Sequence, residues 1–296
     1  MKRTTNLLRF WLLMGLVALV SLGCGRRPAQ ALHQGDRYDA TLAQEQALSE
    51  SLIAEQAQIR ADVMPVTTDS ERALQRFLQA RKYRHDFTHL AESGKLLEEA
   101  VAIDPGFALA YVYLSMHYGT HGNQAARQAA LARAWALRDR VSPGEQLFIT
   151  AMYHGGPSAL ASWEKLVDMY PGDAYAHLIL GYAYKNEYAR YQDALKCFQE
   201  ALALDGTLGN AYNMLGYTYI ALDDMSHAEE AFRTYIDLFP DSGNPYDSMG
   251  DLCLKTGRYE EAAGFFEQAY QLEPTMTWSR DKAAEARLLM QRETQR

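Results

Sequence analysis

The stretch GNAYNMLGYTYIALDDMSHAEEAFRTYIDLFPDS at residues 209–242 is followed at once by GNPYDSMGDLCLKTGRYEEAAGFFEQAYQLEPTM at residues 243–276. Residues 174–208 hold a further copy of the same helix-turn-helix unit, so that three copies follow one another at a spacing of 34 to 35 residues. Self-similarity at this period indicates an array of stacked helical hairpins. This stretch therefore decides the fold class of the chain.

Small and large side chains recur at equivalent places in the three copies. Small residues, where two helices must touch, are Gly181, Gly216 and Gly250 in the first helix and Ala194, Ala228 and Ala262 in the second. Large residues that fill the space between helices are Tyr184, Tyr219, Phe198, Phe232 and Phe266. Pro240 and Pro274 follow the second helix and end it, because proline has no amide N–H and clashes with the preceding turn. One hairpin cannot bury such a face alone, so neighbouring hairpins must stack.

This combination of small, large and proline positions resembles the tetratricopeptide repeat (TPR) family. The resemblance implies an all-α, right-handed solenoid of about six TPR-like helix pairs with a C-terminal capping helix. Three features depart from the family pattern: Gly206 replaces a proline, Tyr235 stands where a small residue is expected, and the segment 185–193 carries one extra residue. We expect these departures to alter local packing angles and not the fold class.

Weaker copies of the unit extend the expected array toward the N-terminus. We predict an array over residues 70–276, closed by a capping helix and tail over residues 277–296. The six predicted repeats span residues 70–107, 108–141, 142–173, 174–208, 209–242 and 243–276. An amphipathic helix is predicted over residues 39–64, ahead of the array.

The N-terminal residues read as an export signal. Lys2, Arg3 and Arg9 precede an apolar run, and the run ends at Ser21-Leu22-Gly23-Cys24. The last four residues resemble the lipobox of bacterial lipoproteins, although Ser21 departs from the usual aliphatic residue. The resemblance implies a signal peptide over residues 1–23, an acylated Cys24 and a lipid-anchored tether over residues 24–38. A cleaved signal of a soluble exported protein and an uncleaved membrane anchor are the alternatives.

The expected location follows from this lipoprotein reading. A protein anchored through Cys24 would lie in the bacterial cell envelope and face the periplasm. Gly25 after the cysteine favours the outer over the inner membrane, by resemblance to enterobacterial sorting rules. The formal net charge of −8 argues against nucleic acid as a partner, since phosphates require a basic face.

No motif for chemistry stands out. His85 and His89, like His117 and His121, are four residues apart, a spacing that can present two imidazoles to a metal. We interpret both pairs as surface or partly buried histidines, and Cys197 and Cys253 as small core residues. We therefore expect no catalytic residues, no metal site, no cofactor and no small-molecule substrate. The alternative is an enzyme with an unrecognised site, which would require a cluster of histidine or carboxylate groups in the folded chain.

The concave side of the array is the predicted functional surface, because the first helix of each stacked pair lines it. The expected groove residues are Tyr175, Tyr182, Lys185, Asn210, Asn213, Tyr217, Asn244, Asp247 and Asp251. Asparagine can hydrogen-bond both edges of an extended peptide, and tyrosine offers rigid contact area. Tyr175 and Tyr182 could instead pack between repeats, whereas Asn213 is harder to explain by packing.

Two kinds of protein partner follow from this reading. The first hypothesis is a lipid-anchored, non-enzymatic scaffold that holds a protein or extended peptide in the groove. The second is an assembly subunit of a bacterial secretion, pilus or envelope-building machine that uses its convex face or ends. The basic clamp of chaperone-binding TPR proteins is absent from positions such as Leu178 and Asn213, so we expect no recognition of an acidic C-terminal tail.

Overall fold

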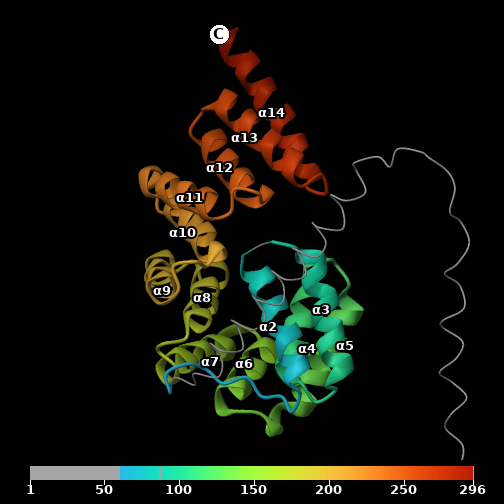
Figure 1. The fold of residues 1–296 in the computed structure, drawn as a ribbon. Coiled ribbons are helices and arrows are strands. Elements are labelled where there is room, and N and C mark those ends of the chain that lie inside the picture. Colours follow the sequence, from blue (N-terminus) through green and yellow to red (C-terminus); the bar gives the residue numbers. More distant parts are fainter. Residues whose placement is uncertain (1–60, 87, 296) are drawn as a thin grey trace, which may run out of the picture. The chain divides into compact units, whose positions relative to one another are not determined.

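The computed structural model describes residues 61–86 and 88–295, and all of them belong to one compact unit, Gln46–Arg296 (Figure 1). The described part of the chain is helical and contains no strand. Its α-helices are α2 (Glu71–His85), α3 (Leu90–Ile103), α4 (Ala108–Thr120), α5 (Gln124–Leu137), α6 (Pro143–His154), α7 (Gly156–Met169), α8 (Ala174–Tyr182), α9 (Tyr191–Leu204), α10 (Gly209–Ala221), α11 (Met225–Leu238), α12 (Gly243–Lys255), α13 (Tyr259–Leu272) and α14 (Thr277–Thr294).

Consecutive helices form antiparallel pairs, from α2 with α3 to α12 with α13. Each pair also packs on the next, and α14 packs on α13 and closes the series. Ser279, Ala283 and Ala286 of α14 are buried against the last pair, while Leu288 on its other side is exposed. The predicted fold class, an all-α solenoid of helix pairs with a C-terminal capping helix, is therefore confirmed.

The small-and-large pattern of the sequence has a direct structural meaning. A Cβ atom added to Gly181 would lie 2.5 Å from Cε1 of Phe198, and one added to Gly250 would lie 2.6 Å from Cδ1 of Phe266. Gly216 meets the ring of Phe232 in the same way. The three phenylalanines are completely buried, so each glycine provides the space that a ring of the paired helix fills.

Tyr235, which departs from the family pattern, is accommodated by a second glycine. Its ring is completely buried, and a Cβ on Gly209 would lie 2.7 Å from its Cε2. The Tyr235 hydroxyl lies 3.3 Å from the backbone oxygen of Asp86 and 3.2 Å from Oδ1 of Asn244. A tyrosine at this position therefore links the end of α2 to the fifth and sixth helix pairs.

The extra residue of the segment 185–193 is accommodated in a helical turn at the end of α8 and not in the loop that follows. Ala183–Glu187 forms a π-helical turn that continues α8. A single π-helical turn is the usual way to insert one residue into a helix without ending it. Lys185 thus lies on a widened helical turn and not in a connecting loop.

Residues 61–70, which we call the N-terminal strap, cross the ends of several helix pairs (Figure 1). The backbone oxygen of Asp62 accepts a hydrogen bond from Gly172 N at 2.8 Å, and Met64 N donates to Oδ2 of Asp173 at 3.1 Å. Thr67 bonds to Glu145, and Thr68 Oγ1 bonds to Oδ2 of Asp104. This strap, which the sequence did not predict, ties together the end of α3, the start of α6 and the start of α8.

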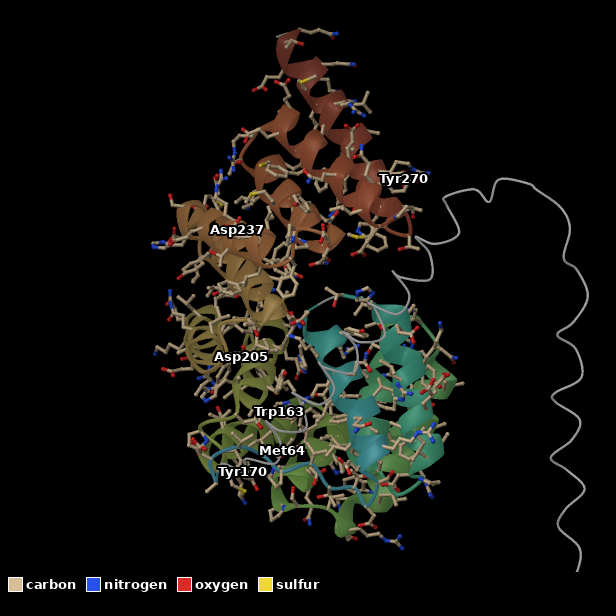
Figure 2. All side chains as sticks on the ribbon, viewed as in Figure 1. Met64, Trp163, Tyr170, Asp205, Asp237 and Tyr270 are labelled. Carbon is tan, nitrogen blue, oxygen red and sulfur yellow. The ribbon has the colours of Figure 1, made fainter. Side chains whose placement is uncertain are left out.

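In addition to these hydrogen bonds, side-chain packing holds the strap in place. Met64 is buried and belongs to the same core as Tyr170, and Figure 2 labels both residues. Gly144, at the start of α6, provides the space for both side chains. Residues 61–64, expected to end an amphipathic helix, are not helical, since the chain turns there before Pro65.

Several predictions concern residues outside the described ranges. They are the signal peptide at residues 1–23, acylation of Cys24, the tether at residues 24–38 and most of the helix at residues 39–64. Within residues 61–86 and 88–295, no helix combines the length and the apolar character that crossing a membrane requires.

Candidate functional site

Three of the expected groove residues are buried instead of exposed. Asn210, Asn213 and Asp247 are only 6%, 4% and 7% exposed, and the neighbouring Leu178 is completely buried. The expectation that these side chains face an open groove is wrong. The reason is that the first helices of adjacent pairs lie side by side. Residues such as Asn213 of α10 and Asn244 of α12 therefore face one another and not an open groove.

The buried asparagines hold the array together. Nδ2 of Asn213 donates to Oδ1 of Asn244 at 3.2 Å, and Oγ of Ser248 donates to Oδ1 of Asn213 at 2.8 Å. The hydroxyl of Tyr182 donates to Oδ1 of Asn210. Packing between repeats therefore explains Asn213, which the sequence suggested was a ligand-binding residue. A buried amide is stable only when such partners satisfy it.

A network of charged and polar side chains links the last repeats to the capping helix α14. Lys282 of α14 lies 3.0 Å from Oδ2 of Asp247 and 2.7 Å from Oδ1 of Asp251. The hydroxyl of Tyr217 donates to the other oxygen of Asp251 at 2.8 Å, and Ser279 donates to Asp247 at 2.6 Å. These groups fix the capping helix to the last repeats, so Asp247 and Asp251 are committed to contacts within the chain.

Tyr175 and Lys185 differ in how far neighbouring side chains cover them. The ring of Tyr175 is covered by α2, with the His85 ring centroid 4.4 Å away and the Arg81 guanidinium 4.4 Å above it. Lys185 is half-exposed, and its ammonium lies 6.0 Å from the centre of the Tyr217 ring. Of the nine expected residues, the six that are not buried are half-buried, namely Tyr175, Tyr182, Lys185, Tyr217, Asn244 and Asp251.

A cavity of about 490 Å³, the inner cavity, lies between the N-terminal helix pairs and α8. Tyr182 and Asn210 line it, so two of the predicted groove residues do reach a hollow. Apolar lining comes from Met116, Met152, Trp163 and Ile179, and polar lining from Arg84, His85, His117, His121, Arg127 and Glu187. Concave, mostly apolar hollows of this size with a few polar groups are typical of binding sites.

A more open hollow of about 930 Å³, the outer groove, adjoins the inner cavity. Both are lined by Leu90 and His121, at the start of α3 and the end of α4. The outer groove also includes the connections α11–α12 and α13–α14. Three of its large apolar side chains are exposed, namely Leu90 (38%), Leu238 (40%) and Trp278 (52%).

The two hollows differ in charge. Arg84 and Arg127 line the inner cavity together with one carboxylate, Glu187. The outer groove is lined by the carboxyl groups of Glu92, Asp241 and Glu273 and, within the part of the chain that the structure describes, by no lysine or arginine. A long ligand that occupied both hollows would therefore meet a basic inner part and an acidic outer part.

His85 lies at the wall of the inner cavity in an unusual environment. It is 6% exposed, its Nε2 lies 3.2 Å from the Tyr113 hydroxyl, and its Nδ1 has no hydrogen-bond partner among the described residues. Burial, together with the nearby charges of Arg81, Arg84 and Lys82, holds the pKa of His85 well below its usual range. The imidazole is therefore neutral at pH 7.

Acidification should destabilise the protein through His85. The unfolded chain binds a proton at His85 near pH 6.5, whereas the folded chain does not, so stability is present at neutral pH and is lost as pH falls below 6.5. Between pH 7.5 and pH 5.0 the loss from this group can reach about 2 kcal/mol. We expect His85→Gln to reduce the pH dependence of the free energy of unfolding by up to that amount. Equal pH dependence in denaturant titrations of both proteins would contradict this role.

Some residues that line the inner cavity could be singled out from the sequence. His85, His117 and His121 attracted attention through their spacing, and all three line it. That spacing can present two imidazoles to a metal, although we interpret both histidine pairs as surface or partly buried residues; no group of three or more metal-ligating side chains occurs in the part of the chain that the structure describes. The ring of His117 instead lies 4.3 Å from that of His121 and fills space beside Gly94. Arg84 and Arg127 gave no sequence signal.

The fold is that of a helical-repeat protein, and two hollows lie among its helix pairs. Residues 209–242 and residues 244–276 each match a family model described as Tetratricopeptide repeat. These matches coincide with the pairs α10–α11 and α12–α13, so the chain contains TPR repeats, as the sequence indicated.

Relatives with known names share parts of the chain. It is 28% identical over 146 residues to "Anaphase-promoting complex subunit 3" of Schizosaccharomyces pombe, which covers 47% of this chain and 21% of the relative. It is 32% identical over 85 residues to "Protein STIP1 homolog" of Dictyostelium discoideum, covering 29% of this chain and 15% of the relative. The chain thus matches about a fifth or less of the length of these relatives.

Among solved structures, the Cut9–Hcn1 hetero-tetramer of the APC/C is similar to this chain. The TM-score is 0.49 at 16% identity, and the match covers 82% of this chain and 45% of the other.

Proposed function

We propose that the protein is a non-enzymatic scaffold that binds an extended segment of a partner protein in the outer groove. The observation that carries this proposal is the grouping of Leu90, Leu238 and Trp278, three exposed apolar side chains from α3, α11 and α14, around one hollow. Exposed apolar groups gathered around a groove mark interaction sites, and tryptophan is frequent among residues that dominate binding energy.

The charge of the groove indicates what the partner segment contains. The carboxyl groups of Glu92 and Asp241 are on its rim, and Glu273 is engaged with Ser242 Oγ at 3.1 Å and Gly243 N at 3.0 Å. An apolar residue next to lysine or arginine would complement this surface. The presence of TPR repeats supports the proposal, as does a relative named as the subunit of a multi-protein complex.

Substitutions in the groove test this proposal directly. Leu90 and Trp278 lie in the first turns of α3 and α14, where an acidic residue is favourable for the helix. We expect Leu90→Asp and Trp278→Asp to reduce partner capture by about 10-fold or more, because each removes an apolar contact. The matched control is Leu288→Asp, since Leu288 is 55% exposed and does not line the groove.

The outcomes of a quantitative pull-down separate the alternatives. Loss of the partner with the two groove variants and retention with Leu288→Asp would support groove binding. If all three variants retain the partner, the groove is not the binding site. Crosslinks that map to the second helices of the pairs would then favour the assembly-subunit hypothesis, in which the convex face is used.

We further propose that the protein is attached to a bacterial envelope membrane through acylated Cys24 and faces the periplasm. The support is the sequence alone: a basic start, an apolar run and Leu22-Gly23-Cys24. Several acyl chains would give stable attachment, since each buried methylene contributes about 0.8 kcal/mol. Mass spectrometry of the mature N-terminus tests this, and an unmodified N-terminus at any other residue would contradict it.

A further inference from the structure

We propose that the inner cavity binds a small organic anion, with an apolar body and one carboxylate. This site goes beyond the partner-binding function, because the ligand would occupy the inner cavity whether or not a partner segment lies in the outer groove. The inference rests on three features: the apolar floor, an arginine with no counter-ion among the described residues, and the size of the hollow.

The floor of the cavity is built from side chains that the fold already holds in place. Trp163 is 4% exposed and its ring packs edge-on against Phe148 with centroids 4.8 Å apart. Ile179 is 8% exposed, and Met116 and Met152 complete the apolar lining. A rigid indole and flexible thioethers together accommodate an apolar group of variable shape. An inorganic anion such as phosphate would leave this surface unused.

Arg84 supplies a positive charge that no carboxylate within residues 61–86 and 88–295 balances. It lines the cavity, is largely removed from solvent and forms no ion pair within the described residues. Burial lowers the pKa of its guanidinium, and the groups that offset this effect are the phenols of Tyr113 and Tyr182, not carboxylates. By contrast, Arg190, Arg233 and Arg258 each meet an acidic partner within 4 Å.

A bound carboxylate would relieve this imbalance. Holding a charge away from water costs free energy unless a counter-ion or hydrogen bonds compensate for it. The planar guanidinium can donate two parallel hydrogen bonds to one carboxylate. Arg127 adds a second cation to the lining; it donates to Gln124 Oε1 at 3.4 Å and has no carboxylate within ion-pair distance among the described residues. Among the described residues, Glu187 is the one acidic residue in the lining, and it is exposed.

The volume of about 490 Å³ lies within the range of roughly 300–1,000 Å³ typical of small-molecule sites. The site therefore takes a ligand of small-molecule size, with its carboxylate at Arg84 and its apolar body against Trp163 and the methionines.

The probe for this site is 4-(2-naphthyl)butyrate, and its primary amide is the neutral control of equal shape. Isothermal titration of the full chain is expected to show the acid binding at least about 10-fold more tightly than the amide, because only the acid can pair with the guanidinium. Inorganic phosphate, tested as an anion without an apolar body, is expected not to bind measurably.

Substitutions of residues that line the cavity test whether the acid binds there. Arg84→Gln is expected to weaken the acid by about 10-fold or more and to leave the amide unchanged. Arg84→Lys keeps the charge but not the planar fork, so it should fall between the two. The matched control is Arg233→Gln on the exposed side of α11, which should change neither ligand. Met152→Trp, which fills the cavity, should weaken both ligands.

Circular dichroism and thermal melts establish that each variant is folded. The proposal is overturned if the acid does not bind, if acid and amide bind equally, or if Arg84→Gln and Arg233→Gln have the same effect. Binding of phosphate as tight as that of the acid would also overturn it, as would binding of peptides with a free C-terminal carboxylate but not of the naphthyl acid. None of these results depends on partner capture by the outer groove, so the two proposals fail separately.

Discussion

Glu145→Ala is expected to lower the free energy of unfolding by about 2–4 kcal/mol, the largest loss that we predict for one polar side chain. Glu145 is completely buried at the start of α6. Its carboxylate accepts hydrogen bonds from Thr67 N at 2.9 Å, Thr67 Oγ1 at 2.5 Å, Ser142 N at 3.0 Å and Ser142 Oγ at 2.8 Å. One side chain thus caps a helix and fastens the N-terminal strap.

The cost arises from the groups left behind. Alanine would leave the half-buried amide of Thr67 without its carboxylate acceptor and Ser142 N with only Thr67 Oγ1 at 3.4 Å. A buried unsatisfied donor costs about 1–3 kcal/mol. The control is Glu99→Ala, which removes an exposed ion pair with Arg76 and should cost less than about 1 kcal/mol. Urea titration of both variants measures the difference. A loss for Glu145→Ala no greater than that for Glu99→Ala would contradict the role of the strap.

Gly216→Ala and Gly264→Ala are expected to change stability in opposite directions. A Cβ on Gly216 would lie 2.6 Å from Cζ of the buried Phe232, so the ring or the helix must move. Overpacking of this kind costs about 1–3 kcal/mol. Gly264 is exposed inside α13 and nothing lies within 4 Å of its added Cβ, so alanine there should stabilise the helix by about 0.5–1 kcal/mol.

Denaturant titration of the two glycine variants shows whether each substitution raises or lowers the free energy of unfolding. This direction is easier to interpret than the size of the change. Destabilisation by the first and stabilisation by the second would identify Gly216 as the place where paired helices nest. Two stabilising substitutions would mean that α10 and α11 can separate without cost, and the explanation of the repeat pattern would then be wrong.

The fold could be predicted because its determinants are local and repeated. Gly181, Gly216 and Gly250 recur with Phe198, Phe232 and Phe266, and each pair makes the same contact in the structure. The strap could not be predicted in this way. Its contacts join residues far apart, such as Thr67 with Glu145, and no periodic pattern records a contact that occurs once.

The candidate site was harder to predict for a related reason. Position within a repeat identifies the side of a helix, but it does not say whether the next helix covers that side. Asn213 is at an expected groove position and is buried by Asn244 and Ser248 of the next pair. The inner cavity instead depends on Arg84 and Trp163, which come from α2 and α7 and share no repeat position.

The central claim is that a partner occupies the outer groove and not the surface of Asn213 and Asn244. Hydrogen–deuterium exchange of the full chain, free and with its partner, tests this claim most directly. The account predicts added protection at the start of α3, in the connection between α11 and α12 and at the start of α14, which line the groove. Protection confined to the second helices of the pairs, with no change at these three places, would contradict it.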